Sequence, residues 1–170
     1  MAADHELGFM HGDLKPNNVG VSDQFGELLV KILDFGRVLN SNQTTLTWTQ
    51  GMPLVTEWTV PEHVKVHLQG RSDYPIHPSV EVLVVGVILG HLVGCRLWPA
   101  GMSEASYILL LASGCFQLPW LASGTPFTFC NEAVPVAYQQ LVDRCLSSDP
   151  ALRPPMAVVA KDLQVIITTL

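Results

Sequence analysis

The sequence has few basic residues and no place where they gather. Its 170 residues include 9 lysines and arginines against 15 aspartates and glutamates, which gives a formal net charge of −6. A protein that grips a nucleic-acid backbone needs a basic stripe on one face to neutralise the phosphates. This shortage argues against nucleic acid as a direct partner.

Paired cysteines and clustered histidines are also missing. No C-x-x-C pair occurs, and the six histidines show no metal-ligand spacing. We therefore expect reduced, buried thiols rather than disulfides or a structural metal, as in a cytoplasmic or nuclear protein. The four cysteines, all in apolar surroundings, are Cys95, Cys115, Cys130 and Cys145.

No stretch has the features of a leader or a membrane span. Residues 1–6 offer neither a basic start nor an apolar run. The most apolar stretch, Val82–Trp98, is interrupted by His91 and Arg96 and is shorter than the roughly 20 apolar residues of a spanning helix. A buried core helix is the favoured interpretation. A membrane-associated protein is the alternative, which solubility without detergent would exclude.

The sequence contains enough apolar residues for one domain with a core, because 48% of its residues are hydrophobic. Residues 19–35 predict a β-hairpin, with strands 19–22 and 28–33 and a turn at 23–26. Residues 36–60 lack periodicity and predict a long loop. The expected fold is therefore mainly α, of the α+β class, with one small hairpin and about five helices. The helical patterns lie at 62–69, 78–95, 103–111, 136–147 and 155–169.

Two short motifs carry the chemistry. Residues 11–18 read HGDLKPNN, and residues 34–36, at the exit of the predicted hairpin, read DFG. Phosphoryl transfer to a hydroxyl needs a carboxylate near the attacking oxygen, a cation on the moving phosphate and oxygen ligands for Mg²⁺. These motifs contain all of those groups. The alternative is that His11 and Asp13 only cap a turn and that Asp34 only ends a strand.

The combination resembles the catalytic loop and metal-binding turn of protein kinases of the serine/threonine type, and the resemblance extends over the whole chain. It implies ATP and Mg²⁺ as cofactors and a protein as substrate or partner. It implies that Asp13 orients the acceptor hydroxyl, that Lys15 neutralises the γ-phosphate, and that Asn18 and Asp34 bind the metal. His11, Phe35 and Gly36 would have structural roles.

Further landmarks follow in the order of the kinase family. Residues 60–62, VPE, resemble the end of the activation segment, and residues 149–154, DPALRP, resemble the late loop whose arginine pairs with that glutamate. We therefore expect an ion pair between Glu62 and Arg153. Residues 55–58, VTEW, which include Thr56, and residues 97–101, LWPAG, are similar to the stress-activated branch of the MAP kinases.

Three departures from the family pattern concern control of the loop. Gly12 stands where many kinases have an arginine that grips a phosphorylated activation loop, and residues 51–53, GMP, replace the T-x-Y phosphorylation motif. We therefore expect no phosphate-driven ordering switch. Glu81 replaces an aspartate that holds the catalytic loop, and its extra methylene, worth about 1.3–1.5 Å of reach, predicts a more loosely held loop.

The largest departure is the absence of a nucleotide-binding lobe from these residues. The 170 residues contain neither a phosphate-binding G-x-G-x-x-G loop nor the strand lysine of a nucleotide lobe. We expect residues 1–170 to be a partial, truncated kinase domain, namely the C-terminal lobe without the small lobe, and residues 7–10 to be the last turn of a helix before the loop. One interpretation is a kinase fragment that is inactive alone and needs a nucleotide lobe, supplied by the same polypeptide or by another one in trans. The other is a catalytically dead pseudokinase that acts as an interaction or decoy module.

Overall fold

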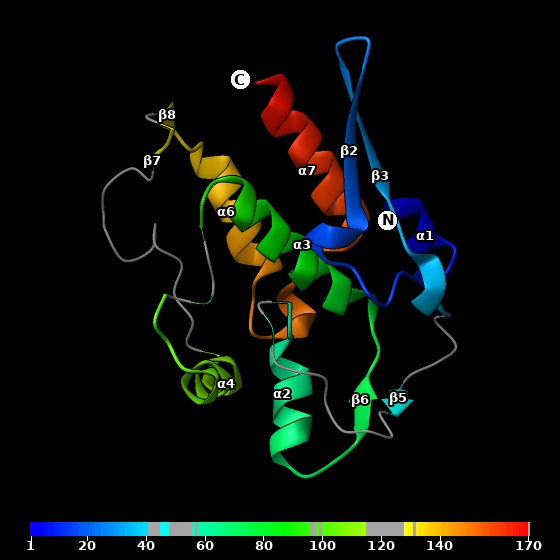
Figure 1. Cartoon of the computed structure of the whole chain (residues 1–170), viewed down its shortest axis with the longest axis vertical. Helices are drawn as coiled ribbons and strands as arrows, with labels where there is room; N and C mark the ends of the chain where they lie inside the picture. Colours follow the sequence, from blue (N-terminus) through cyan, green and yellow to red (C-terminus); the bar gives the residue numbers. More distant parts are fainter. Residues whose placement is uncertain are drawn as a thin grey trace.

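The computed structural model describes residues 1–40, 45–47, 56, 58–95, 98, 100–114, 128–130 and 132–169. Within them, helices supply most of the regular structure, which confirms the predicted mainly α fold (Figure 1). The described residues form six α-helices, where about five were predicted. They are α1 (Ala2–Glu6), α2 (Pro61–Leu68), α3 (Pro78–Leu92), α4 (Glu104–Ser113), α6 (Val136–Cys145) and α7 (Met156–Thr168).

The strands in the described part of the chain are short and pair two by two in antiparallel fashion. The pairs are β1 (Phe9–Met10) with β4 (Leu39–Asn40), β2 (Val19–Gln24) with β3 (Glu27–Ile32), β5 (Thr45–Thr47) with β6 (Asp73–Pro75), and β7 (Thr128–Phe129) with β8 (Glu132–Ala133). Short 3₁₀ helices are η1 (Pro16–Asn18), η2 (Phe35–Arg37) and η3 (Pro150–Leu152). The β1–β4 pair closes the segment that contains both candidate motifs.

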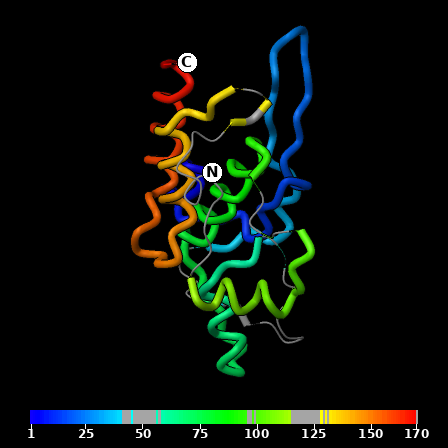
Figure 2. The backbone as a smooth tube through the Cα atoms, turned by 90° about the vertical axis from the view of Figure 1, so that its left-hand side faces the viewer, coloured from blue at the N-terminus to red at the C-terminus, as the bar shows by residue number. Residues whose placement is uncertain are grey.

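The β2–β3 hairpin is present as predicted, but its strands are longer. They run to Gln24 and restart at Glu27, so only Phe25 and Gly26 form the turn. These two residues have φ values of 60° and 86°, the left-handed pair that matches the twist of a tight hairpin. The hairpin stands clear of the helices. Figure 1 projects it beside α7, whereas the turned view in Figure 2 separates the two.

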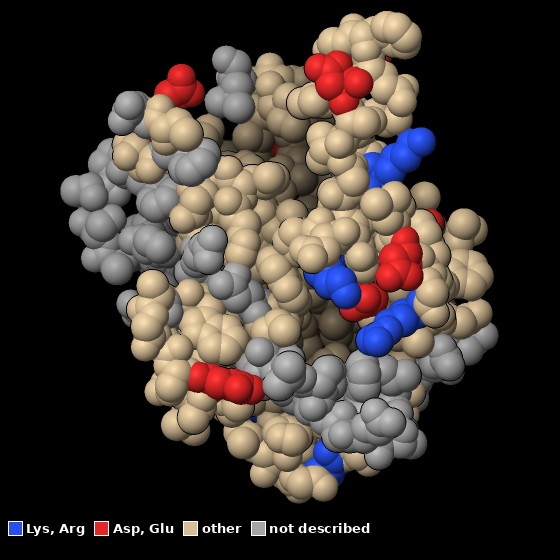
Figure 3. Space-filling view, viewed as in Figure 1, with Lys and Arg blue, Asp and Glu red and all other residues tan. Residues whose placement is uncertain are grey.

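Charged side chains are unevenly spread on the face shown in Figure 3. Most of that face is uncharged, while groups of both signs gather over the loop that follows β1 and over η2, next to a hollow. These are the segments that contain the two sequence motifs. On this face, the charged groups therefore gather where the sequence predicts chemistry.

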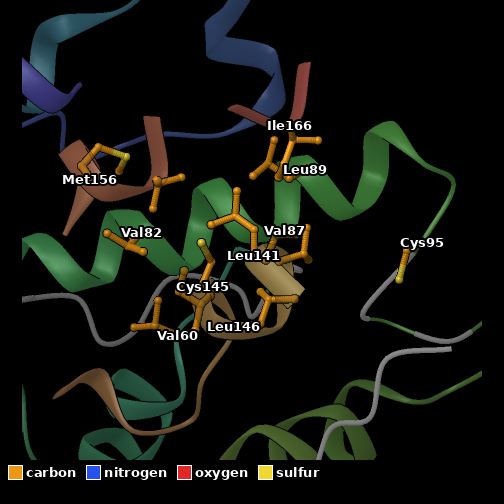
Figure 4. Close-up of a cluster of buried hydrophobic side chains, with 13 residues drawn as sticks. Val60, Val82, Val87, Leu89, Cys95, Leu141, Cys145, Leu146, Met156 and Ile166 are labelled. Atoms are coloured by element: carbon orange, nitrogen blue, oxygen red, sulfur yellow. The ribbon is translucent and has the colours of Figure 1, made fainter. Parts of the chain in front are cut away.

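Helix α3 forms the centre of the core, as its nearly all-round hydrophobic sequence predicts. Figure 4 shows side chains of α3, α6 and α7 pointing toward one another, among them Val87, Leu141 and Ile166. The helices pack closely because Gly86 has no side chain, and a Cβ there would lie 2.7 Å from Cβ of Cys145. None of the helices in the described part of the chain is both long and apolar enough to cross a bilayer.

Helix α3 ends at Leu92 rather than at Cys95, where the apolar pattern placed its end. Gly94 has a φ of 75°. The N–H groups of Cys95 and Gly94 donate to the carbonyls of Gly90 and His91, at 2.9 and 3.0 Å. This is a Schellman cap, which satisfies the last carbonyls of a helix through a left-handed glycine.

The predicted helical turn over residues 7–10 is wrong. Helix α1 ends at Glu6, Gly8 has a φ of 79°, and Phe9–Met10 is the strand β1 paired with β4. The loop predicted over residues 36–60 likewise contains η2, β4 and β5 in its described part. In both places pairing with a distant segment overrides the local pattern, which shows no periodicity of its own.

Two of the predicted buried thiols are confirmed. Cys95 and Cys145 are buried free cysteines, and burial raises their thiol pKa to about 11 and about 12. Such thiols stay protonated and unreactive at neutral pH. The prediction is wrong for Cys130, a free cysteine that is exposed. Cys115 lies outside the described residues.

Candidate active site

His11 fastens the loop of residues 11–18 to the end of the hairpin. It is buried, and its Nε2–H donates to the carbonyl of Leu33 at 2.8 Å. Its Nδ1 accepts from the backbone N–H of Asp13 at 3.3 Å. One nitrogen donates and the other accepts, which is the pattern of a neutral imidazole. The ring also lies 5.0 Å from the ring of Phe35, so His11 joins the two sequence motifs.

Asp13, Lys15 and Asn18 form one hydrogen-bonded cluster. Nζ of Lys15 donates to Oδ2 of Asp13 at 2.8 Å. Nδ2 of the buried Asn18 donates to the backbone carbonyl of Asp13 at 2.7 Å and lies 3.4 Å from its Oδ2. The structure thus brings together three of the predicted site residues, and about a quarter of the Asp13 side chain, 24%, remains exposed.

The hairpin brings Asp34 to the same place. The residues that open β2 and close β3, Val19 and Ile32, are register partners, and the N–H of Leu33 donates to the carbonyl of Asn18 at 2.8 Å. Asp34 follows directly, in a left-handed conformation with a φ of 61°, and its Oδ1 caps η2 by accepting from the N–H of Gly36 at 3.3 Å. Its carboxylate is exposed, at the exit of the hairpin and one residue after the backbone bond to Asn18.

Glu81 holds the loop despite its extra methylene. The backbone N–H of Gly12 donates to Oε1 of Glu81 at 2.7 Å. The loose hold expected from glutamate is therefore not what the structure shows. Gly12 takes a φ of +76°, and the carbonyl of Arg37 leaves no room for a side chain there, since a Cβ on Gly12 would lie 2.1 Å from it.

The ion pair predicted between Glu62 and Arg153 is present and bidentate, with N···O distances of 2.6 and 2.8 Å. The Arg153 side chain has no exposed surface, and it also donates to the carbonyls of Ser147 and Ser79, at 2.9 and 3.0 Å. The pair connects α2 with the segment after η3 and with the start of α3. The pair therefore holds together the segments of the fold that support the site.

Thr56 makes a local turn. Its N–H donates to Oγ1 of Thr59 at 2.9 Å, and its own Oγ1 accepts from the N–H of Trp58 at 3.3 Å. This turn directs the chain into α2. Residues 51–53, where we expected the T-x-Y motif to be replaced, lie outside the described residues, as do most of residues 96–99.

A cavity of about 360 Å³ opens beside Asp13 and Lys15. Aromatic and aliphatic side chains, including those of Trp58 and Val80, form much of its wall. His63 also lines it, with Nε2 bonded to the carbonyl of Pro75 at 2.9 Å, and burial lowers the His63 pKa. A partly apolar hollow next to an acidic and a basic group suits a peptide side chain.

The oxygen donors of Asn18 and Asp34 fit a Mg²⁺ ion that is shared with phosphates. Because Nδ2 of Asn18 faces Asp13, Oδ1 is the amide atom for a cation. Within the described residues, no three His, Cys, Asp or Glu side chains form a metal-binding group of their own. Mg²⁺ in phosphoryl-transfer sites commonly takes only one or two carboxylates and completes its shell with water and phosphate oxygens.

Sequence reasoning missed His5. This residue lies on α1 and its Nε2 is 2.8 Å from Oε2 of Glu81. No motif marks it, because the contact depends on where a five-residue helix packs. It also missed Arg37, whose backbone carbonyl faces Gly12.

The family model and the related proteins that match this chain agree on one family. A family model described as the protein kinase domain matches residues 1–163. The chain is 28% identical over 160 residues to the serine/threonine/tyrosine-protein kinase HT1 of Arabidopsis thaliana, covering 94% of this chain and 35% of that protein. It is 30% identical over 166 residues to the serine/threonine-protein kinase PkaA of Streptomyces coelicolor, covering 98% of this chain and 27% of that protein. The chain therefore spans about a third or less of the length of these relatives.

Proposed function

The chain belongs to the protein kinase domain family, and we propose that it supplies the acceptor and metal half of a site that moves the γ-phosphate of ATP to a serine or threonine hydroxyl of a protein. The observation that carries this proposal is the cluster of Asp13, Lys15 and Asn18, with Asp34 held beside it by the hairpin. Each group that phosphoryl transfer needs on the acceptor side is present in that cluster.

The roles follow from chemistry and position. The carboxylate of Asp13 accepts the proton of the substrate hydroxyl or orients its oxygen. Lys15, 2.8 Å from Asp13, balances the negative charge of the moving phosphate. Asn18 and Asp34 would hold Mg²⁺, which when bound neutralises charge on the phosphate oxygens. His11 and Glu81 keep the loop in position, through Leu33 and Gly12.

We further propose that these residues correspond to the C-terminal lobe of a kinase and that their nearest likeness is the stress-activated branch of the MAP kinases. Support for the lobe comes from the order of elements: site loop, hairpin, α2, central helix α3 and the Glu62–Arg153 pair. Support for the branch is the order of short sequence motifs alone, such as the segment from Thr56 to Glu62.

The hairpin supports the need for a second, nucleotide-binding unit. Val21 and Val30 are register partners, and Leu28 lies on the same face two residues from Val30. These side chains are 62%, 60% and 75% exposed. An apolar sheet face of this kind is normally covered. We propose that a nucleotide lobe covers it, in the same polypeptide or in trans, and that these 170 residues alone do not transfer phosphate. The same exposed face suits the alternative of a catalytically dead interaction module.

Thermal unfolding with Mg–ATP tests the metal half of the proposal. We expect Mg–ATP to leave the unfolding temperature of the 170 residues unchanged. When a kinase nucleotide lobe is joined to them, Mg–ATP should raise the unfolding temperature, because a ligand at 100 times its Kd stabilises the folded protein by about 2.7 kcal/mol. Asp34→Asn should weaken that shift. Asp23→Asn is the matched control, because Asp23 is a carboxylate within the hairpin that leads to Asp34, and it caps the turn at Gly26. Equal shifts for Asp34→Asn and Asp23→Asn would show that Asp34 takes no part in binding Mg–ATP.

A further inference from the structure

His63 joins two walls of the cavity beside Asp13 and Lys15, which we call the acceptor cavity. It lies in the first turn of α2, and its Nε2 is 2.9 Å from the carbonyl oxygen of Pro75 in β6. A carbonyl oxygen only accepts, so Nε2 carries the proton and donates it. The ring also meets the ring of Tyr74, with 5.5 Å between their centroids. His63 is therefore a contact through which α2 holds β6 (Figure 1).

The strand β6 depends on such contacts. It has three residues and follows α2 after a turn at the exposed Gly70, which has a φ of 70°. Its pairing partner β5 is equally short. A pair of strands of this length is marginal by itself, so contacts with α2 decide whether β6 stays in place. Because Tyr74 and Pro75 line the acceptor cavity, the position of β6 also decides whether that cavity is closed.

A second proton on His63 adds a charge and another N–H donor to this wall, and both need a partner or water. The neighbouring carboxylate, Glu62, already has both oxygens bound by Arg153, at 2.6 and 2.8 Å. Glu62 attracts the charged ring and Arg153 repels it, while the Pro75 carbonyl favours it. Helix α4, which also packs on α2, contributes Glu104 and Tyr107 as titratable groups. Other charged or titratable groups that line the cavity are Asp13, Lys15, Arg37, Tyr74, His77 and Glu81.

Burial is the largest of these influences, and it lowers the pKa of His63 below its ordinary value of 6.5. The closed wall therefore binds fewer protons than an open wall in which water reaches the ring. Opening becomes more favourable as the pH falls through 6.5, and the effect is complete below the lowered pKa of the closed state.

We propose that His63 is a pH-sensitive contact of the acceptor cavity: the neutral ring holds β6 against α2, and the protonated ring releases it. The proposal rests on the proposed function for what the cavity receives. The contact itself requires neither nucleotide nor substrate.

Amide hydrogen exchange of the buried Tyr74 tests this on the 170 residues as they stand. Between about pH 7.5 and about pH 5.5, and after correction for the intrinsic rate, its exchange should become several-fold faster, with about tenfold as the limit for one proton. His63→Gln keeps an N–H for the Pro75 carbonyl but does not titrate, so it should remove this response. Two histidine controls should keep it: His67→Gln, at an exposed position one turn later on α2, and His77→Asn, which still caps α3.

The NMR titration of the His63 ring in the unchanged chain gives a second result that needs no variant. Its midpoint should lie below 6.5, and a midpoint at or above 6.5 would overturn the proposal. An undiminished response of Tyr74 in His63→Gln, or its loss in His67→Gln, would overturn it too, because another group would then be the source.

The buried amide of Val142 in α6 reports global unfolding. Equal acceleration at Val142 and Tyr74 would mean that the whole fold responds to pH rather than this wall, which also contradicts the proposal. Neither nucleotide binding nor phosphate transfer is measured, so this failure is distinct from failure of the proposed function.

Discussion

Replacing Arg153 with leucine is expected to lower the free energy of unfolding by about 3–5 kcal/mol, the usual effect of breaking a buried ion pair from one side. The Arg153 side chain has no exposed surface and binds both oxygens of Glu62. Its removal leaves that carboxylate without its partner in a site where its side chain is only 15% exposed. Two backbone carbonyls also lose their donor. Urea denaturation measures the loss.

Arg144 provides the matched control. It pairs with Asp162 at 2.5 Å, but the two side chains are 48% and 34% exposed. Arg144→Leu should therefore change the free energy of unfolding by no more than about 1 kcal/mol. A double-mutant cycle with Glu62→Gln should give strong coupling to Arg153. Similar losses for both arginines, or no coupling in the cycle, would show that the buried pair does not stabilise the fold more than an exposed one.

Gly12→Ala is expected to be the most damaging small substitution in the loop. The left-handed backbone, with a φ of +76°, costs a residue with a Cβ about 1–2 kcal/mol, and the collision with the Arg37 carbonyl at 2.1 Å adds about 1–3 kcal/mol of strain. Gly12→Arg, which restores the residue that many kinases have, should be no better. Thermal or urea unfolding measures the change in stability.

Gly26→Ala is the control that isolates the collision. Gly26 has a φ of +86° but nothing lies within 4 Å of an added Cβ, so only the backbone term of about 1–2 kcal/mol remains. The two variants should thus differ clearly in stability. Equal losses would mean that the loop moves away from Arg37 at little cost and that glycine is not required at position 12.

The sequence predicted what local pattern encodes. The hairpin, the central helix and the helices after it follow from alternation, apolar periodicity and caps such as Ser103, whose side chain accepts from the N–H of Ser106. The helical turn predicted over residues 7–10 was wrong because β1 exists through its pairing with β4, a contact between segments that no local window contains.

The same distinction between local pattern and distant contacts applies to the site. The motifs identified Asp13, Lys15, Asn18 and Asp34; the structure joins the first three by hydrogen bonds and brings the backbone before Asp34 to Asn18. The hold of Glu81 on the loop could not be predicted, because it is a contact between α3 and a loop residue far away in the sequence, which no local pattern encodes. A comparison of glutamate and aspartate by length alone therefore gave the wrong expectation.

In the proposed function, these residues hold the acceptor and metal half of a kinase site and need a nucleotide lobe to complete it. The most direct test is transfer of labelled γ-phosphate from ATP to a protein substrate, measured with the 170 residues alone and with a kinase nucleotide lobe joined to them. We expect no transfer by the residues alone, and transfer by the joined protein that falls by about 10²–10⁴-fold in Asp13→Asn. Asp13-dependent transfer without the lobe would contradict it, as would a joined protein that binds Mg–ATP and transfers no phosphate, or transfers it equally well without the Asp13 carboxylate.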